Sequence, residues 1–361
     1  MPTVRQLLAT LNDSFPFARA EAWDKTGLQI GSADADVARV VVAHEVTDAV
    51  LDCAGENAAL VVYHPLIFRP LESLDFKSHT ARLAARCVRA ELSLISVHTA
   101  LDNAPPPGAL GDSLAGELGL QDVAVLSPSG REGLCKIAVF TPPEALEKVG
   151  AALWQAGAGK IGNYDEASFR ARGTGTFRPL PGANPYSGTL GERKEADEFR
   201  LEVIVAVERV DAAIAAMIAA HPYEEVAYDV YPLRNEIHPY GPARVGELAQ
   251  ALTLDDFAAF VQTNLHAPNL RVVRGARNEI RRVACVPGSG ASYISAVVAA
   301  GCDCLVTGDV KHHDALQAQA LGLSLIDATH TATERAAVPL IANALGGWKV
   351  EVCELDTNPF E

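Results

Sequence analysis

Residues 37–102 alternate between strand-like and helix-like patterns, and this alternation limits the possible folds more than any other feature of the chain. Apolar runs typical of buried strands cover 37–46, 59–68 and 92–102, and helical patterns cover 47–58 and 78–91. The order strand, helix, strand, helix, strand predicts a parallel sheet, whose carboxyl-terminal edge is where functional residues gather. We therefore predict an α/β fold with its site at that edge.

The same alternation returns in the last third of the chain, after a stretch of different composition. There we predict strands at 281–288, 304–310 and 323–329, and helices at 254–265, 292–301, 312–322 and 333–345. The middle stretch predicts strand, helix, irregular strand and loop, strand, helix and strand at 135–142, 142–157, 168–188, 198–207, 210–221 and 225–233. We predict two similar α/β halves, 1–133 and 234–361, that form one body interrupted by a ferredoxin-like α+β insert at 134–233.

Composition excludes several classes of protein. A formal net charge of −15 and a pI near 5.1 disfavour broad nucleic-acid binding. No stretch is long and apolar enough for a bilayer, and the N-terminus predicts an amphipathic helix rather than a secretory signal. We expect the seven cysteines to be mostly small buried residues in a reducing, cytoplasmic compartment; Cys302 and Cys304 are too closely spaced for a usual zinc knuckle.

Histidines carry the main functional signal. His64, His98 and His330 each stand at the end of a predicted strand, and Asp102 and Glu334 follow the latter two at a spacing of four. Residues four apart share a helical face, so each pair can present both side chains to one point. Imidazole and carboxylate ligands together suit zinc, manganese, iron or a similar divalent ion.

Each of these residues also has an ordinary structural interpretation. His64 precedes a proline and can be a turn residue, His98 can be a satisfied strand-end histidine, and Asp102 can cap a helix. Glu334 can be a solvated carboxylate in a first helical turn. Their shared location at strand ends favours a single metal site over five separate coincidences.

Two further segments follow predicted strands. The stretch "PGSGAS", 287–292, can hold an anion with its backbone N–H groups, or it can be a tight turn between strand and helix. In "TGDVKHHDA", one histidine can be a proton donor or can support a metal ligand; the catalytic residue is unknown, and His313 is the candidate. The chain contains no GxSxG, HExxH or CxxCH motif, so metal-activated water is the most economical chemistry.

The segments "AWDKTGLQIG", "VVYHPLIFRPL", "SVHTALDNAPPPG", "HPYEEVAYDVYPL", "TGDVKHHDA" and "DATHTATE" occur in this order. Through them the chain resembles, over nearly its whole length, the NGG-interacting-factor-three-like family of dinuclear-metal-centre hexameric proteins, often named GTP cyclohydrolase 1 type 2 homologues. The resemblance implies two divalent metal ions between the α/β halves, a PII-like or ferredoxin-like insert and a homohexamer. The ligands it implies are His64, His98, Asp102, His330 and Glu334.

Within the resemblance, Asp102 and Glu334 are suited to bridge two ions, because a carboxylate has two oxygens to share. Trp23, Asp24 and His313 would lie near the site without necessarily binding metal. Many family members carry a histidine where this chain has Tyr63. A phenol is a poorer ligand than imidazole at neutral pH, so we expect one metal position to be held less strongly or to be completed by water.

Two functional hypotheses follow. The first is a metal-dependent hydrolase of the cyclohydrolase, amidohydrolase or phosphoester type, acting on a small nucleotide-like substrate. The alternative is a non-catalytic, metal-binding regulatory or chaperone-like hexamer in which the insert senses a small ligand. The exposed acidic and aromatic residues of "HPYEEVAYDVYPL" suit the subunit contacts of such an assembly, although the segment can also be an ordinary strand of the insert.

Overall fold

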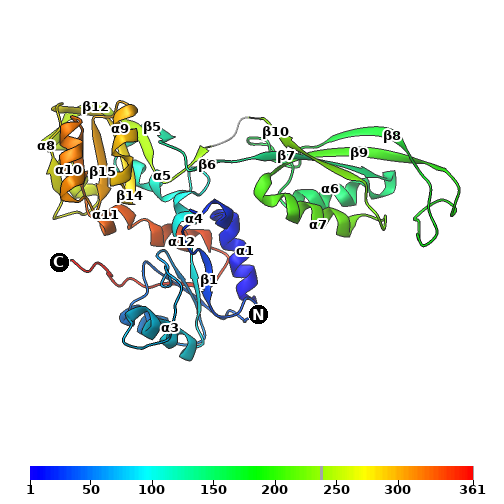
Figure 1. Ribbon diagram of the computed structural model, residues 1–361, viewed down its shortest axis with the longest axis horizontal. Helices are drawn as coiled ribbons and strands as arrows, with labels where there is room; N and C mark the ends of the chain where they lie inside the picture. The colour runs from blue at the N-terminus through cyan, green and yellow to red at the C-terminus, as the bar shows by residue number, and fades with distance from the viewer. Residues whose placement is uncertain (236–238, 361) are drawn as a thin grey trace. The chain divides into compact units, whose positions relative to one another are not determined.

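The computed structural model describes residues 1–235 and 239–360, and the chain forms two compact units (Figure 1). Unit 1 comprises Met1–Gly130 and Pro239–Glu361, and unit 2 comprises Arg131–His238. Unit 2 is therefore an insertion in the chain of unit 1. Besides the elements described below, the chain forms two short strands and four 3-10 helices: β6 (Gly130–Arg131), β11 (Pro239–Tyr240), η1 (Phe17–Arg19), η2 (Pro143–Ala145), η3 (Val207–Arg209) and η4 (Ala291–Tyr293).

The first sheet of unit 1 has the strand order β1-β4-β3-β2-β17. Its strands are β1 (Gly27–Ile30), β2 (Val40–Ala43), β3 (Ala59–Val62), β4 (Ser93–Ser96) and β17 (Val350–Val352). Strands β17, β2, β3 and β4 are parallel, which confirms the three parallel strands expected from the sequence, and β1 pairs antiparallel with β4. The third predicted strand was too long, because 98–102 turn out to form helix α4 (His98–Asp102).

Helices cover both faces of this sheet, because successive side chains of its strands point alternately into two hydrophobic cores. In β2, Val40 and Val42 belong to one buried cluster, and Val41 and Ala43 belong to the other. The side chains of Thr47 and Ser78 accept backbone N–H groups, and these caps fix where two of the covering helices begin. The first cluster includes residues of α1 (Val4–Ser14), α4 and α12 (Ala337–Ala344), and the second includes residues of α2 (Asp48–Ala54) and α3 (His79–Arg89).

The second sheet of unit 1 has the order β13-β16-β15-β14-β12-β5. Only β14, β15 and β16 are parallel, and the other pairings are antiparallel, so the two halves of unit 1 differ in their sheets. Its strands are β5 (Leu120–Val125), β12 (Arg244–Thr253), β13 (Arg271–Val273), β14 (Glu279–Ser289), β15 (Cys304–Gly308) and β16 (Ser324–Asp327). Its helices are α5 (Leu110–Glu117), α8 (Leu254–Asn264), α9 (Ile294–Ala299) and α10 (His312–Ala320).

The last predicted helix is divided in two. The sequence pattern predicted one helix over 333–345, whereas the structure has α11 (His330–Glu334) followed by α12 (Ala337–Ala344). Pro339 explains the interruption: it has no backbone N–H and would clash with the preceding turn of a continuous helix, but it fits in the first turn of α12. The division leaves α11 as a short helix that begins with a histidine and ends with a glutamate.

Unit 2 is a four-stranded antiparallel sheet with two helices. The strand order is β10-β7-β9-β8, and helices α6 and α7 lie together on one face of the sheet (Figure 1). The elements in chain order are β7 (Leu134–Thr141), α6 (Leu146–Gln155), β8 (Phe169–Phe177), β9 (Lys194–Ala206), α7 (Val210–Ala220) and β10 (Tyr228–Leu233). The apolar residues of α6 and α7 share one core with β7 and β9.

Two expectations from composition concern the whole chain. Of the seven cysteines, six are buried, as predicted, and Cys53 is exposed because it lies on the outer side of α2. Within the part of the chain that the structure describes, every helix is too short or too polar to span a bilayer.

Candidate metal centre

Three histidines stand at the carboxyl ends of three neighbouring parallel strands. His44 directly follows β2, and one residue separates His64 from β3 and His98, the first residue of α4, from β4. Parallel neighbours end at the same edge of a sheet, so the local sequence pattern brings the three rings together. The ring centroids of His44 and His64 are 4.8 Å apart, and those of His64 and His98 are 5.2 Å apart.

The second half of unit 1 contributes His330 and Glu334 from the two ends of α11. Thr329, the residue before this helix, has a φ of 70°, which a β-branched residue rarely adopts. Such backbone strain is held only where the surrounding structure enforces it, and it is common at functional sites. The Glu334 side chain is 5% exposed, so its carboxylate is removed from water.

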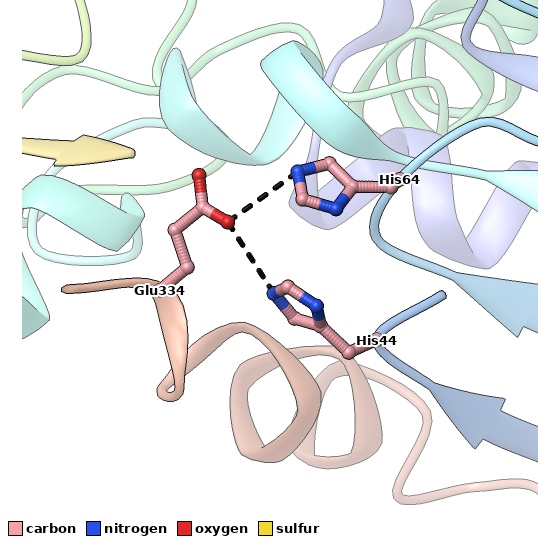
Figure 2. Close-up of side chains that lie close together, drawn as sticks. All are labelled: His44, His64 and Glu334. Carbon is pink, nitrogen blue, oxygen red and sulfur yellow. Dashed lines mark ion pairs between the residues drawn. The ribbon is translucent and has the colours of Figure 1, made fainter. Parts of the chain in front are cut away.

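One carboxylate oxygen is the meeting point of the cluster. Glu334 Oε2 lies 3.4 Å from His44 Nε2 and 3.3 Å from His64 Nε2. Figure 2 shows both rings pointing toward this oxygen. His330 Nε2 lies 3.0 Å from the same oxygen. Ligand atoms of His44, His64 and Glu334 all fall within 4.8 Å of one another. The two halves of unit 1 thus bring three imidazoles and a carboxylate together, which is a donor set suited to a divalent transition metal ion.

The buried atoms of this cluster lack hydrogen bonds of good geometry. His44 Nδ1, His44 Nε2 and Glu334 Oε2 are buried without a hydrogen-bond partner among the described residues. Buried polar atoms are nearly always satisfied, so these unpartnered atoms fit a metal ion that would take the carboxylate oxygen and one nitrogen of the His44 ring. Gly288 provides room for the carboxylate: a Cβ at this position would lie 2.2 Å from Glu334 Oε1. The residues therefore fit a bound cation.

Carboxylates hold three of the rings from the opposite nitrogen. His64 Nδ1 lies 3.2 Å from Glu45 Oε1, His98 Nδ1 lies 2.9 Å from Asp24 Oδ1, and His330 Nδ1 lies 2.7 Å from Asp309 Oδ2. In each ring Nε2 is left to face the site. This carboxylate–histidine arrangement fixes the tautomer and orientation of metal-binding histidines.

A second group of donors surrounds His98. Tyr63 is 1% exposed and donates its hydroxyl proton to Asp102 Oδ1 at 2.8 Å. Burial, with the nearby Asp102 carboxylate, raises the pKa of Tyr63 well above its ordinary value, so the phenol keeps its proton. Burial also raises the pKa of Asp102 to about 7. Asp102 lines the cavity, and its second oxygen, Oδ2, has no hydrogen bond to the described residues.

The ionisation of the cluster reflects a competition between burial and charge. Burial alone would lower the pKa of His44 and His330, but the neighbouring carboxylates, chiefly that of Glu334, raise both to about 9. Burial would raise the pKa of Glu334, but His330 and His44 lower it to about 2. Burial lowers the pKa of His64, which favours its neutral, metal-binding form.

A cavity of about 350 Å³ within unit 1 is lined by Tyr63, His64, His98, Asp102, His330 and Glu334. Trp23 lines this cavity and is 54% exposed, and its ring contacts that of Phe68, with centroids 5.7 Å apart. Trp23 also lies edge-on to His98, with centroids 5.9 Å apart. The rest of the wall includes the polar residues Asn103, Ser289, Ser292 and Tyr293 and the apolar residue Val286.

The structure brings all five sequence-predicted ligands to this one cavity: His64, His98, Asp102, His330 and Glu334 line it. It does not bring His313 there, because that side chain is exposed on α10 and contacts His312 instead. Asp24 and Trp23 lie beside His98, as the resemblance implied.

Sequence reasoning missed His44 and Glu45. The signal was present, because "AHE" directly follows the first predicted strand and the strand-end rule that selected His64 applies equally to His44.

The stretch "PGSGAS" is less open to an anion than expected. Gly288 N donates to Thr333 Oγ1 at 3.0 Å, and Gly290 N donates to Thr307 Oγ1 at 2.8 Å. Two of its backbone donors are therefore already used inside the protein. These bonds favour the alternative interpretation, a turn that ends β14 and makes room for Glu334.

The fold and the site define a mixed α/β protein with a histidine and carboxylate cluster between two sheets of one unit. The chain belongs to the Duf34/NIF3 (NGG1p interacting factor 3) family, whose model matches residues 2–359. It is 39% identical over 317 residues to a GTP cyclohydrolase 1 type 2 homolog of Halalkalibacterium halodurans, covering 87% of this chain and 85% of that protein.

Two further relatives cover almost the whole chain. A GTP cyclohydrolase 1 type 2 homolog of Bacillus subtilis is 37% identical over 365 residues, covering 99% of this chain and 97% of the relative. The crystal structure of a Bacillus cereus protein related to NIF3 matches with a TM-score of 0.85 and 35% identity, covering 100% of this chain and 99% of that chain.

Proposed function

We propose that this protein binds two divalent metal ions and is a metal-dependent hydrolase acting on a small nucleotide-like substrate. The observation that carries the proposal is the convergence of His44, His64 and His330 on Glu334 Oε2. Glu45 and Asp309 contact the Nδ1 atoms of His64 and His330 and hold these two rings in place, as metal-binding histidines require.

The donor groups divide between two positions. His44, His64, His330 and Glu334 would hold one ion, and His98 and Asp102 would contribute to the second. Because Tyr63 is protonated and bonded to Asp102, it leaves the second position with fewer protein ligands. When bound, the ions would supply Lewis acidity and a water of lowered pKa.

The chain's own residues supply substrate positioning. Trp23 lines the cavity and is 54% exposed, so its indole ring is available for a planar base to stack on. Asn103, Ser292 and Tyr293 offer polar groups for the rest of such a molecule. The names of the curated relatives, GTP cyclohydrolase 1 type 2 homolog, agree with a nucleotide-like substrate.

The test combines metal analysis with turnover. Wild type, His330→Ala, Glu334→Ala and the control His313→Ala are purified, their bound metals are quantified, and each is assayed against GTP and a panel of phosphoesters after defined metal loading. We expect metal and turnover to be lost in the first two variants and retained in the control. Unchanged metal content in both would refute the site, and full metal content without turnover of any substrate would refute the hydrolase.

A second candidate function is a non-catalytic, metal-binding regulatory or chaperone-like hexamer. Strand β10 is an edge strand of unit 2 and leaves Tyr228, Val230 and Tyr231 more than a third exposed. Such an edge suits contact with another subunit. We also propose that unit 2 is a ferredoxin-like or PII-like domain, which its strand, helix, strand, strand, helix, strand order supports.

Mass measurement in solution tests the assembly. Light scattering on the complete chain should give a hexamer, and Val230→Lys on β10 should reduce its size if this edge takes part. A monomer at all concentrations would refute the hexamer.

A further inference from the structure

Unit 2 contains a cavity of its own, of about 460 Å³, that is separate from the metal centre. Most of its wall is apolar or aromatic. Phe140, Phe177, Tyr186 and Tyr223 contribute rings, and the loop after β8 contributes prolines and Leu180. A cavity of this size, with apolar walls and a few polar groups, is typical of small-molecule sites.

A buried carboxylate faces this cavity. Glu198, on β9, is 8% exposed and lines the wall. Its Oε1 accepts a hydrogen bond of 3.0 Å from the Tyr223 hydroxyl, and its Oε2 has no hydrogen bond to the described residues. No Lys, Arg or His among the described residues forms an ion pair with it. A carboxylate buried to this degree is ordinarily paired with a cation.

The backbone makes room for this carboxylate. On β8, Gly173 is the direct partner of Glu198, and Gly175 lies two residues further along the same strand. A Cβ at Gly175 would come within 2.0 Å of Glu198 Oε2, whereas a Cβ at Gly173 would meet open space. The absence of a side chain at 175 therefore keeps Glu198 Oε2 at the cavity wall.

The surrounding charges favour a cation. Glu224 and Glu225 also line the cavity, and Arg178 is the basic residue in the same wall. Glu224 Oε1 accepts the backbone N–H of Asn184 at 2.8 Å, which fixes the loop that carries Tyr186. Aromatic faces attract cations through their quadrupoles, so the rings and the carboxylates both favour a positively charged ligand.

We propose that unit 2 has a binding site for a small organic cation, namely an ammonium group joined to a flat apolar body. The ammonium group would lie against Glu198 Oε2, and the body would contact the rings of Phe140, Phe177 and Tyr223. The site is independent of the metal centre, since none of its residues lies in unit 1.

The test uses phenethylamine as the probe and phenethyl alcohol, of the same shape but without charge, as its match. Binding to the complete chain is measured by calorimetry and by ligand-observed NMR. We expect the amine to bind with a Kd below about 1 mM and the alcohol at least about tenfold more weakly. In Glu198→Gln, which preserves the shape and the acceptor for Tyr223, amine affinity should fall to that of the alcohol.

Glu195→Gln is the matched control, because Glu195 lies on the same strand outside the cavity wall. It should bind the amine as wild type does, and metal content should be unchanged in both variants. Equal affinity for amine and alcohol, equal loss in both variants, or no amine binding would each overturn the proposal. If a second copy of the chain fills the cavity, phenethylamine will not bind.

Discussion

Glu334 in unit 1 and Glu198 in unit 2 are both buried carboxylates at the wall of a cavity, but their surroundings differ. Three imidazole nitrogens approach Glu334 Oε2, whereas a single phenol binds Glu198 and aromatic rings surround it. Imidazoles offer lone pairs to a metal ion, and aromatic faces offer only a diffuse negative potential. The neighbours of a buried carboxylate therefore determine which cation it suits.

The largest expected effect is on metal affinity. Glu334→Ala removes the oxygen on which the three rings converge, so zinc affinity should fall by more than about 100-fold, beyond the usual effect of an outer-sphere change. Competition with a chelator of known affinity measures it. Glu198→Gln is the control and should leave zinc affinity unchanged; an equal loss in both variants would remove the distinction between the two carboxylates.

Next in size is the pH dependence of stability in the metal-free protein. The pKa of His44 and His330 rises from 6.5 to about 9 on folding, so their stabilisation is complete below pH 6.5 and is lost as pH rises toward 9. The lowered pKa of Glu334 gives stabilisation that is complete above pH 4.5 and is lost toward pH 2.

We therefore expect the free energy of unfolding to fall by on the order of 2–3 kcal/mol between pH 6.5 and 9. Denaturant titrations across this range measure it, with the protein kept free of metal. His44→Gln should flatten the profile, whereas His313→Gln, on the exposed side of α10, should follow wild type. A profile that rises with pH would contradict the assigned ion pairs.

A smaller effect is expected at the carboxylates behind the rings. Asp309→Asn keeps a group beside His330 Nδ1 but removes its charge, so zinc affinity should fall by about tenfold. Chelator competition again provides the measurement. Asp229→Asn, in the exposed strand β10 of unit 2, is the matched control. If Asp309→Asn binds zinc as tightly as wild type, the contact with Asp309 does not contribute to metal binding by His330.

The smallest expected effect separates two glycines of one strand. Gly175→Ala should push the Glu198 carboxylate aside and weaken phenethylamine binding by about threefold to tenfold, with a modest stability cost of about 1 kcal/mol. Gly173→Ala should do neither, because its Cβ would meet open space. Calorimetry measures phenethylamine binding to both variants. Equal affinities would show that binding does not depend on the position of Glu198 Oε2.

Much of unit 1 could be predicted from the sequence. Apolar runs with helical segments between them predicted three of the four parallel strands of the first sheet, and the strand-end rule selected His64, His98 and Asp102. Local pattern did not reveal that 98–102 are helical, because five residues are too few to show a helical period. It also did not separate α11 from α12, where Pro339 was the only signal.

The sequence by itself determined which residues can bind a metal ion and that they follow strands, because side-chain chemistry and strand periodicity are local properties. Only the tertiary structure decided that His44 and Glu334 meet, since 290 residues and a whole inserted unit separate them along the chain. It alone also showed that Glu198 is buried with no ion-pair partner among the described residues, because burial depends on what packs against β9 from distant segments.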